Sequence, residues 1–83
     1  MYGVILQKPA EIFLKKIDKF ERDKIIKKLK NLKDNPELGK PLTGNLAGLW
    51  SLRIGDYRAI YQIRKSELLI LVLKIGHRKN AYD

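Results

Sequence analysis

Residues 49–61 contain two runs of alternating apolar and polar side chains, which the dipeptide Gly55-Asp56 separates. Glycine at the first position of a two-residue loop is typical of a type II′ turn, which joins two antiparallel strands. The predicted hairpin has a defined register, in which Ile54 pairs with Tyr57 and Arg53 pairs with Arg58. This register determines which side chains share each face of the sheet.

One face of the predicted hairpin is apolar, and the other is partly basic. The apolar face carries Trp50, Leu52, Ile54, Tyr57, Ala59, Tyr61 and Ile63. The other face carries Leu49, Ser51, Arg53, Arg58, Ile60, Gln62 and Arg64. Like charges directly opposite each other destabilise a sheet, so the Arg53/Arg58 pair indicates an anionic ligand held by two guanidinium groups. Two solvated arginines that splay apart are the alternative, because solvent screens their repulsion.

Two amphipathic helices are predicted after a first strand at Tyr2–Gln7. The first begins near Pro9, which suits the first turn of a helix. The second begins at Asp18, which resembles a capping box together with Glu21, and Asn35-Pro36 ends it. Apolar residues at helical spacing mark the sides that need covering: Phe13, Ile17 and Phe20 in the first helix, and Ile25, Ile26, Leu29 and Leu32 in the second.

Three strands are predicted after these helices, at about Leu49–Ile54, Tyr57–Arg64 and Leu68–Gly76. Residues 37–48 are rich in glycine and proline and predict a connecting loop. The last strand does not alternate, so we expect it to be central and buried on both faces. The order is β-α-α-β-β-β, which predicts one α+β domain over residues 1–83, with a helical hairpin packed on one face of a small, mostly antiparallel sheet.

The charge of the chain favours a polyanionic partner. The 83 residues include 18 lysines and arginines against 9 aspartates and glutamates, a net charge of +9. For a domain this small, nucleic acid is favoured first, an acidic protein second, and a basic surface kept for solubility is the alternative. The chain has no cysteine and one histidine, so we expect no disulfide, no thiolate chemistry, no metal site and no cofactor. It shows no signal peptide or membrane span, and we expect a cytoplasmic protein.

The segment after the last strand adds further candidate site residues. Arg78 can bring a third guanidinium to the arginine pair, and Tyr82 can stack on a base or take a proton. His77 can act as an acid or a base near neutral pH. The alternatives are a structural hydrogen bond for His77 and a frayed tail for Tyr82. We interpret the lysines of the second helix as a solvated face.

The strand Asp56-Tyr57-Arg58-Ala59-Ile60-Tyr61-Gln62-Ile63 and the ending Ile75-Gly76-His77-Arg78-Lys79-Asn80-Ala81-Tyr82 resemble the RelE/ParE toxin superfamily of bacterial and archaeal toxin–antitoxin systems. The resemblance covers nearly the whole chain and includes Lys40-Pro41-Leu42 before the hairpin. The pattern is more similar to RelE than to ParE. Ser51 stands where some relatives have a second lysine.

The resemblance implies a metal-independent endonuclease that cleaves messenger RNA in the ribosomal A site, where the 2′-hydroxyl attacks the adjacent phosphate. It implies that Arg58 binds the scissile phosphate, that Arg78 acts with it, and that Arg53 stabilises charge. It also implies that Tyr82 stacks on the base, and we expect His77 and Lys79 to contact the substrate.

The resemblance also implies a partner, a small acidic antitoxin that wraps the toxin in a hetero-oligomer. Two other functions stay open at this stage. One is a ParE-like inhibitor of DNA gyrase, which needs no catalytic residue. The other is a catalytically weak relative that only binds RNA.

Overall fold

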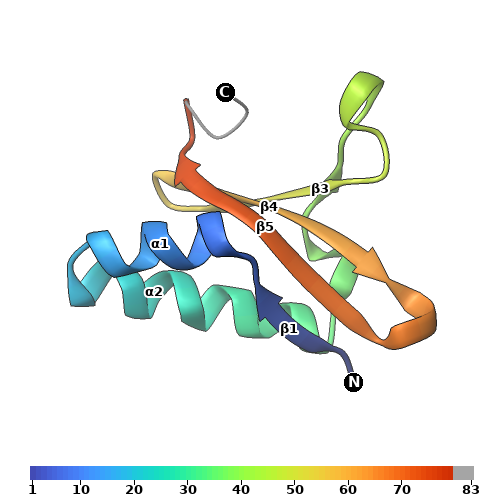
Figure 1. Ribbon diagram of the computed structural model, residues 1–83, viewed down its shortest axis with the longest axis horizontal. Helices are drawn as coiled ribbons and strands as arrows, with labels where there is room; N and C mark the ends of the chain where they lie inside the picture. Colours follow the sequence, from blue (N-terminus) through green and yellow to red (C-terminus); the bar gives the residue numbers. More distant parts are fainter. Residues whose placement is uncertain (80–83) are drawn as a thin grey trace.

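The computed structural model describes residues 1–79, in which two helices lie against one face of a five-stranded sheet (Figure 1). The helices are α1 (Lys8–Lys16) and α2 (Lys19–Lys30). The strands are β1 (Gly3–Leu6), β2 (Lys40–Pro41), β3 (Trp50–Ile54), β4 (Tyr57–Arg64) and β5 (Leu69–His77). The sheet order is β1-β5-β4-β3-β2, with β1 parallel to β5 and the other neighbours antiparallel. The predicted α+β architecture is therefore confirmed.

The β3–β4 hairpin has the predicted register. Ile54 pairs with Tyr57, and Arg53 pairs with Arg58. Gly55 has a φ of 59°, a left-handed conformation that glycine adopts without strain. At the other end of the hairpin Trp50 stacks on Tyr61, with ring centroids 6.2 Å apart.

The core lies between the helices and the apolar face of the sheet. Ile25 and Leu29 of α2 meet Leu52 and Ala59 of the hairpin in one buried cluster. Burying an isoleucine or leucine side chain contributes roughly 1.5–3 kcal/mol, so this face holds the helices in place. The predicted start of α2 is confirmed, because the Asp18 carboxylate accepts a hydrogen bond of 2.8 Å from the Glu21 amide. The helix ends at Lys30, before the predicted Asn35-Pro36, and a 3-10 turn over Asn31–Lys33 follows it.

Strand β5 is central, as predicted, but the expectation that both of its faces are buried is wrong. Ile70 and Val72 are fully buried, whereas Leu71 and Leu73 are only half-buried because the helices cover one face of the sheet. Tyr61 pairs with Val72 and Ile60 pairs with Lys74, so Leu73 is the extra residue of a β-bulge. The bulge restores Ile75 to the core face and places Lys74 on the face that the helices leave open.

The segment predicted as a loop over residues 37–48 contains the short strand β2 and two 3-10 turns, at Pro36–Leu38 and Gly44–Leu46. The buried hydroxyl of Tyr61 fastens this segment, since it donates to the Pro36 carbonyl (2.7 Å) and accepts from the Gly39 amide (3.1 Å). Gly39 lies so close to β3 that a Cβ there would collide with the Ser51 carbonyl oxygen. Sequence reasoning missed β2 because two residues carry no periodicity.

Candidate active site

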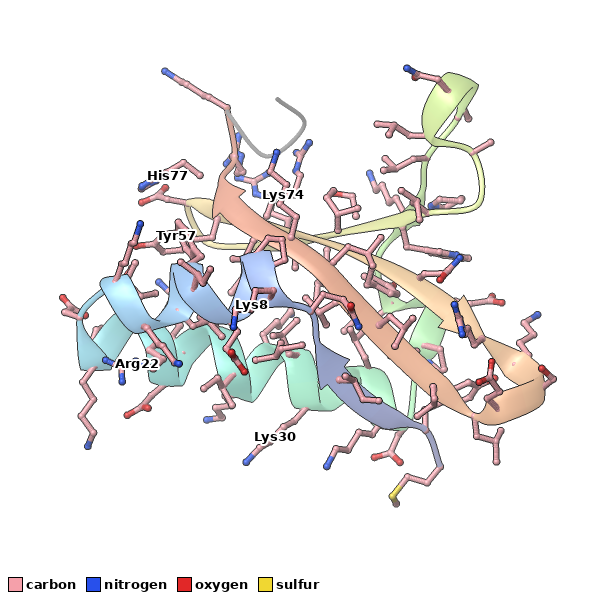
Figure 2. All side chains as sticks on the ribbon, viewed as in Figure 1. Lys8, Arg22, Lys30, Tyr57, Lys74 and His77 are labelled. Carbon is pink, nitrogen blue, oxygen red and sulfur yellow. The ribbon has the colours of Figure 1, made fainter. Side chains whose placement is uncertain are left out.

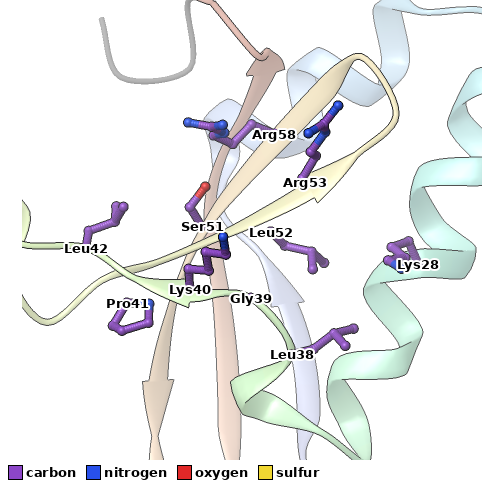
Figure 3. A pocket seen from close by; sticks show the side chains of 10 residues that line it. All are labelled: Lys28, Leu38, Gly39, Lys40, Pro41, Leu42, Ser51, Leu52, Arg53 and Arg58. Atoms are coloured by element: carbon purple, nitrogen blue, oxygen red, sulfur yellow. The ribbon is translucent and has the colours of Figure 1, made fainter.

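Arg53 and Arg58 lie side by side on the open face of the sheet. They are direct neighbours across β3 and β4, and both line one cavity of about 480 Å³. Arg53 is exposed and Arg58 is half-buried. Figure 3 shows both side chains on the same side of the two strands, with their guanidinium groups directed apart. The groups are splayed in this conformation, and rotation of the exposed Arg53 side chain would let both guanidinium groups donate hydrogen bonds to one phosphate.

The cavity around these arginines is basic. Lys28 of α2 and Lys40 of β2 add two further cations, and none of the ten lining residues is acidic (Figure 3). The other lining residues are Leu38, Gly39, Pro41, Leu42, Ser51 and Leu52. A concave surface lined by charges of one sign concentrates ions of the opposite sign. The cavity is therefore suited to an anionic ligand.

Nearly buried side chains form the floor of the open face near the arginines. Ser51 on β3 is 9% exposed and Ile60 on β4 is 6% exposed, although both lie on the face away from the helices. The arginines therefore extend from a supported surface. Ser51 carries a hydroxyl and no charge, so the cations at this cavity come from its neighbours.

Arg78 and Lys79 lie beside the turn of the hairpin. The Arg78 amide donates to the Asp56 carbonyl (2.9 Å), which fixes the chain directly after β5. Both side chains are exposed and line a second cavity, of about 420 Å³. The structure thus brings Arg53 and Arg58 together in one cavity and places Arg78 and Lys79 at another, near the same end of the sheet.

His77 lies on the face of the sheet that carries the helices. It pairs with Tyr57, and its ring is 5.2 Å from the Tyr57 ring and 6.1 Å from the ring of Phe13 on α1 (Figure 2). The bulge at Leu73 explains this placement, because it moves His77 to the side opposite the arginine pair. His77 is nevertheless exposed and lines the second cavity together with Arg78 and Lys79, so its predicted substrate contact stays a prediction.

Tyr57 joins this aromatic cluster to the helices. Burial raises the pKa of its hydroxyl, and a hydrogen bond to the Glu21 carboxylate and the negative charges of Glu21, Asp18 and Asp56 raise the pKa further. The hydroxyl therefore keeps its proton to higher pH than a free tyrosine does.

Known proteins similar to this chain include toxins of toxin–antitoxin systems. The profile of a family described as ParE toxin of type II toxin–antitoxin system, parDE, matches residues 4–82. The chain belongs to the RelE/ParE toxin family. In the crystal structure of the toxin–antitoxin complex RelBE2 from Mycobacterium tuberculosis, a chain with 30% sequence identity superposes with a TM-score of 0.86. That match covers 93% of this chain and 98% of the other, so the RelE-like fold is shown.

Two curated relatives of this RelE/ParE-family chain come from Mycobacterium tuberculosis (strain ATCC 25618 / H37Rv). Toxin RelG is 40% identical over 45 residues, and Toxin RelE is 42% identical over 52 residues. These matches cover 54% and 61% of this chain. The matched stretch spans about half of each relative's own length, 52% for RelG and 54% for RelE.

Three cations of this RelE/ParE-family chain were absent from the sequence-based site. Lys28 and Lys40 line the arginine cavity, and Lys74 pairs with Ile60 on the open face (Figure 2). Lys74 could have been found as a lone cation in an otherwise aliphatic strand. Lys28 carries no such signal, because α2 contains several other lysines. The predicted site residue Tyr82 lies outside the residues that the structure describes.

Two further observations concern metal binding and membrane spans. Within residues 1–79, no three histidine, cysteine, aspartate or glutamate side chains gather as a set of metal ligands. In the same described part of the chain, no helix has the length and apolar character needed to span a membrane.

Proposed function

We propose that this chain is a cytoplasmic toxin that cleaves messenger RNA in the ribosomal A site. The observation that carries the proposal is the Arg53/Arg58 pair, which faces a cavity without an acidic lining residue. The net charge of +9 supports a nucleic-acid substrate, because each basic side chain that contacts a phosphate releases counterions from the RNA and so strengthens binding.

The proposed reaction needs positive charge more than a protein nucleophile. The substrate's 2′-hydroxyl gives up its proton as its oxygen attacks the adjacent phosphorus, and the bond from phosphorus to the 5′-oxygen breaks. The leaving 5′-oxygen takes up a proton, so that a 2′,3′-cyclic phosphate and a free 5′-hydroxyl form. Negative charge grows on the phosphoryl oxygens in the pentacoordinate transition state. Arg58 binds the scissile phosphate, and Arg53 stabilises its developing charge, since an arginine is a poor proton acceptor. Because the substrate supplies its own nucleophile, the remaining rate acceleration comes from holding the 2′-oxygen in line with the phosphorus.

The other predicted residues take supporting roles in this proposal. Arg78 is a second phosphate ligand or the donor to the leaving 5′-oxygen. Lys79 contacts the substrate backbone, and Tyr82 stacks on the base. His77 is the weakest of these assignments, because its ring packs against Phe13 and Tyr57.

The proposed protein partner is a small acidic antitoxin. The similar RelBE2 structure is a toxin–antitoxin complex. A negatively charged chain complements the basic open face and would compete there with RNA. We therefore propose a hetero-oligomer in which the antitoxin blocks the arginine cavity.

A ParE-like inhibitor of DNA gyrase is the second candidate, and the ParE profile match over residues 4–82 favours it. Such a protein acts by binding alone. It would need no phosphate to be attacked between Arg53 and Arg58.

Primer extension on messenger RNA in a reconstituted translation reaction tests the proposal. The unaltered chain should cut within A-site codons, and Arg58→Ala should slow cleavage about 10²- to 10³-fold, the usual effect of removing one donor to a developing oxyanion. Arg64→Ala is the matched control, because Arg64 lies at the other end of the same strand, outside the lining of the cavity, where it forms an ion pair with Glu67. Inhibition of DNA supercoiling without messenger-RNA cleavage would establish the gyrase function instead.

A further inference from the structure

The edge of β3 beside the arginine pair is not covered by a strand. In the described sheet, β2 begins only at Lys40, which pairs with Ser51, so no strand residue pairs with Leu52–Ile54 on that side. The Leu42 amide donates to the Leu49 carbonyl (2.8 Å), which shows that odd-numbered residues of β3 direct their main-chain groups toward β2. Arg53 continues that alternation, and its amide therefore points outward from the free edge.

Lys28 reaches the same edge from the helix side of the sheet. It extends from α2, is half-buried, and lines the cavity together with Leu52 and Arg53 (Figure 3). The cavity is thus continuous from the open face, where Arg58 lies, around the edge of β3 to α2. None of the ion pairs found within residues 1–79 uses Lys28, Lys40 or Arg53.

We propose that an RNA strand bound at the arginine pair continues over the free edge of β3. The phosphate next to the scissile one binds to the Lys28 ammonium and the outward amide of Arg53. This inference rests on the proposed function, because the arginine pair must hold RNA first. Lysine is a point charge and a main-chain amide reads no base, so this second site binds backbone without regard to sequence.

The shape of the edge favours RNA over a strand from an acidic protein. Added strands bind through a row of main-chain hydrogen bonds. The free edge is three residues long, and only Arg53 among them directs its main-chain groups outward. The edge has several basic side chains but few outward main-chain groups for hydrogen bonding. A phosphodiester backbone needs the first and not the second.

The salt dependence of RNA binding tests this site. A single-stranded oligonucleotide with 2′-O-methyl groups cannot be cleaved, so it reports binding alone. Lys28→Gln should reduce the slope of log affinity against log salt by about 0.7, which is about fivefold weaker binding at 0.1 M salt. Lys28→Arg should restore the slope. Lys30→Gln is the control with the same charge change on the same helix, because Lys30 points away from the sheet (Figure 2).

A second measurement follows the main chain. Titration with a 2′-O-methyl trinucleotide, which carries two neighbouring phosphates, should shift the nuclear magnetic resonance of the Arg53 amide in the unaltered protein, and less so in Lys28→Gln. A Lys28→Gln slope equal to that of Lys30→Gln would overturn the proposed site, as would no binding of the oligonucleotide at all. Loss of affinity for an acidic antitoxin peptide with an unchanged RNA slope would also overturn it, and would make the edge a protein contact.

These outcomes are separable from the test of function. A-site cleavage that depends on Arg58, combined with an unchanged slope in Lys28→Gln, keeps the nuclease and removes the second phosphate site. A reduced slope in a protein that cuts no messenger RNA removes the nuclease and keeps the path of the RNA backbone.

Discussion

Tyr57 links the hairpin, the helices and the chain end through one side chain. Its ring is buried beside Phe13 of α1 and His77 of β5, and its hydroxyl bonds to the Glu21 carboxylate of α2. Glu21 is therefore engaged with Tyr57, while its amide serves the Asp18 cap. These contacts connect the end of the sheet that carries Arg53 and Arg58 to both helices.

The raised pKa of Tyr57 predicts a loss of stability at alkaline pH. The unfolded chain releases the phenol proton near pH 10, whereas the folded chain keeps it to higher pH. The unfolded state then binds fewer protons than the folded state, so the free energy of unfolding falls as pH rises above about 10. Relative to Tyr57→Phe, the unaltered chain should lose up to about 1.4 kcal/mol per pH unit. Urea unfolding from pH 8 to 11 measures this, and parallel curves for the two proteins would contradict it.

The arginine pair could be predicted because a two-residue turn allows only one register between the two strands. Gly55-Asp56 is the sequence signal for that turn. The position of His77 could not be predicted in the same way. Counting alternate residues along β5 from Ile70 places His77 on the open face, and only the bulge at Leu73 reverses it. A bulge depends on how two strands pair, so one strand's sequence does not reveal it.

Strand β2 depends on a contact with a residue more than twenty positions away. Its approach to β3 is set by the Tyr61 hydroxyl, which bonds to Pro36 and Gly39, and by the absence of a side chain at Gly39. The two helices and the hairpin were predictable from local periodicity. Strand β2 and the position of Lys28 at the cavity could not be predicted in this way, because both depend on contacts between segments far apart in the sequence.

Tyr61→Phe should loosen this segment and destabilise the fold. The change leaves the Pro36 carbonyl and the Gly39 amide without their partner, which costs about 1–3 kcal/mol. Urea unfolding measures the loss, and faster hydrogen exchange at the Gly39 amide localises it. Tyr2→Phe is the control, because the Tyr2 hydroxyl makes no hydrogen bond within residues 1–79. Equal stability of the two variants would mean that the hydroxyl does not fasten β2.

The molecule as a whole carries more positive charge than its fold requires. Ion pairs among the described residues lie at the surface, as between Lys15 and Glu11, and such pairs contribute little. The net charge of +9 opposes the compact state through repulsion. Anions that bind the arginine cavity relieve part of this repulsion and should stabilise the folded chain.

Sulfate should therefore raise the melting temperature more than chloride does at equal ionic strength. Both salts screen the repulsion, but sulfate also binds the cavity, and a ligand that binds only the folded state stabilises it. The excess effect of sulfate should be smaller in Arg58→Gln than in Arg64→Gln. Sulfate's general stabilising effect on proteins is common to both variants. Calorimetry measures the two differences, and identical ones would place the anion elsewhere.

The bulge at Leu73 lets β5 keep one apolar face on the helices along its whole length. Leu73 is the one residue between Val72 and Lys74 that no β4 residue faces, so its deletion would join two registers that already match, with Lys74 still on the open face and Ile75 still in the core. A pairing that absorbed Leu73 into the ladder would instead exchange the two faces of β5 from that point on, with Lys74 among apolar side chains and Ile75 on the open face. The unpaired residue therefore matches the apolar pattern of the strand to a single sheet face.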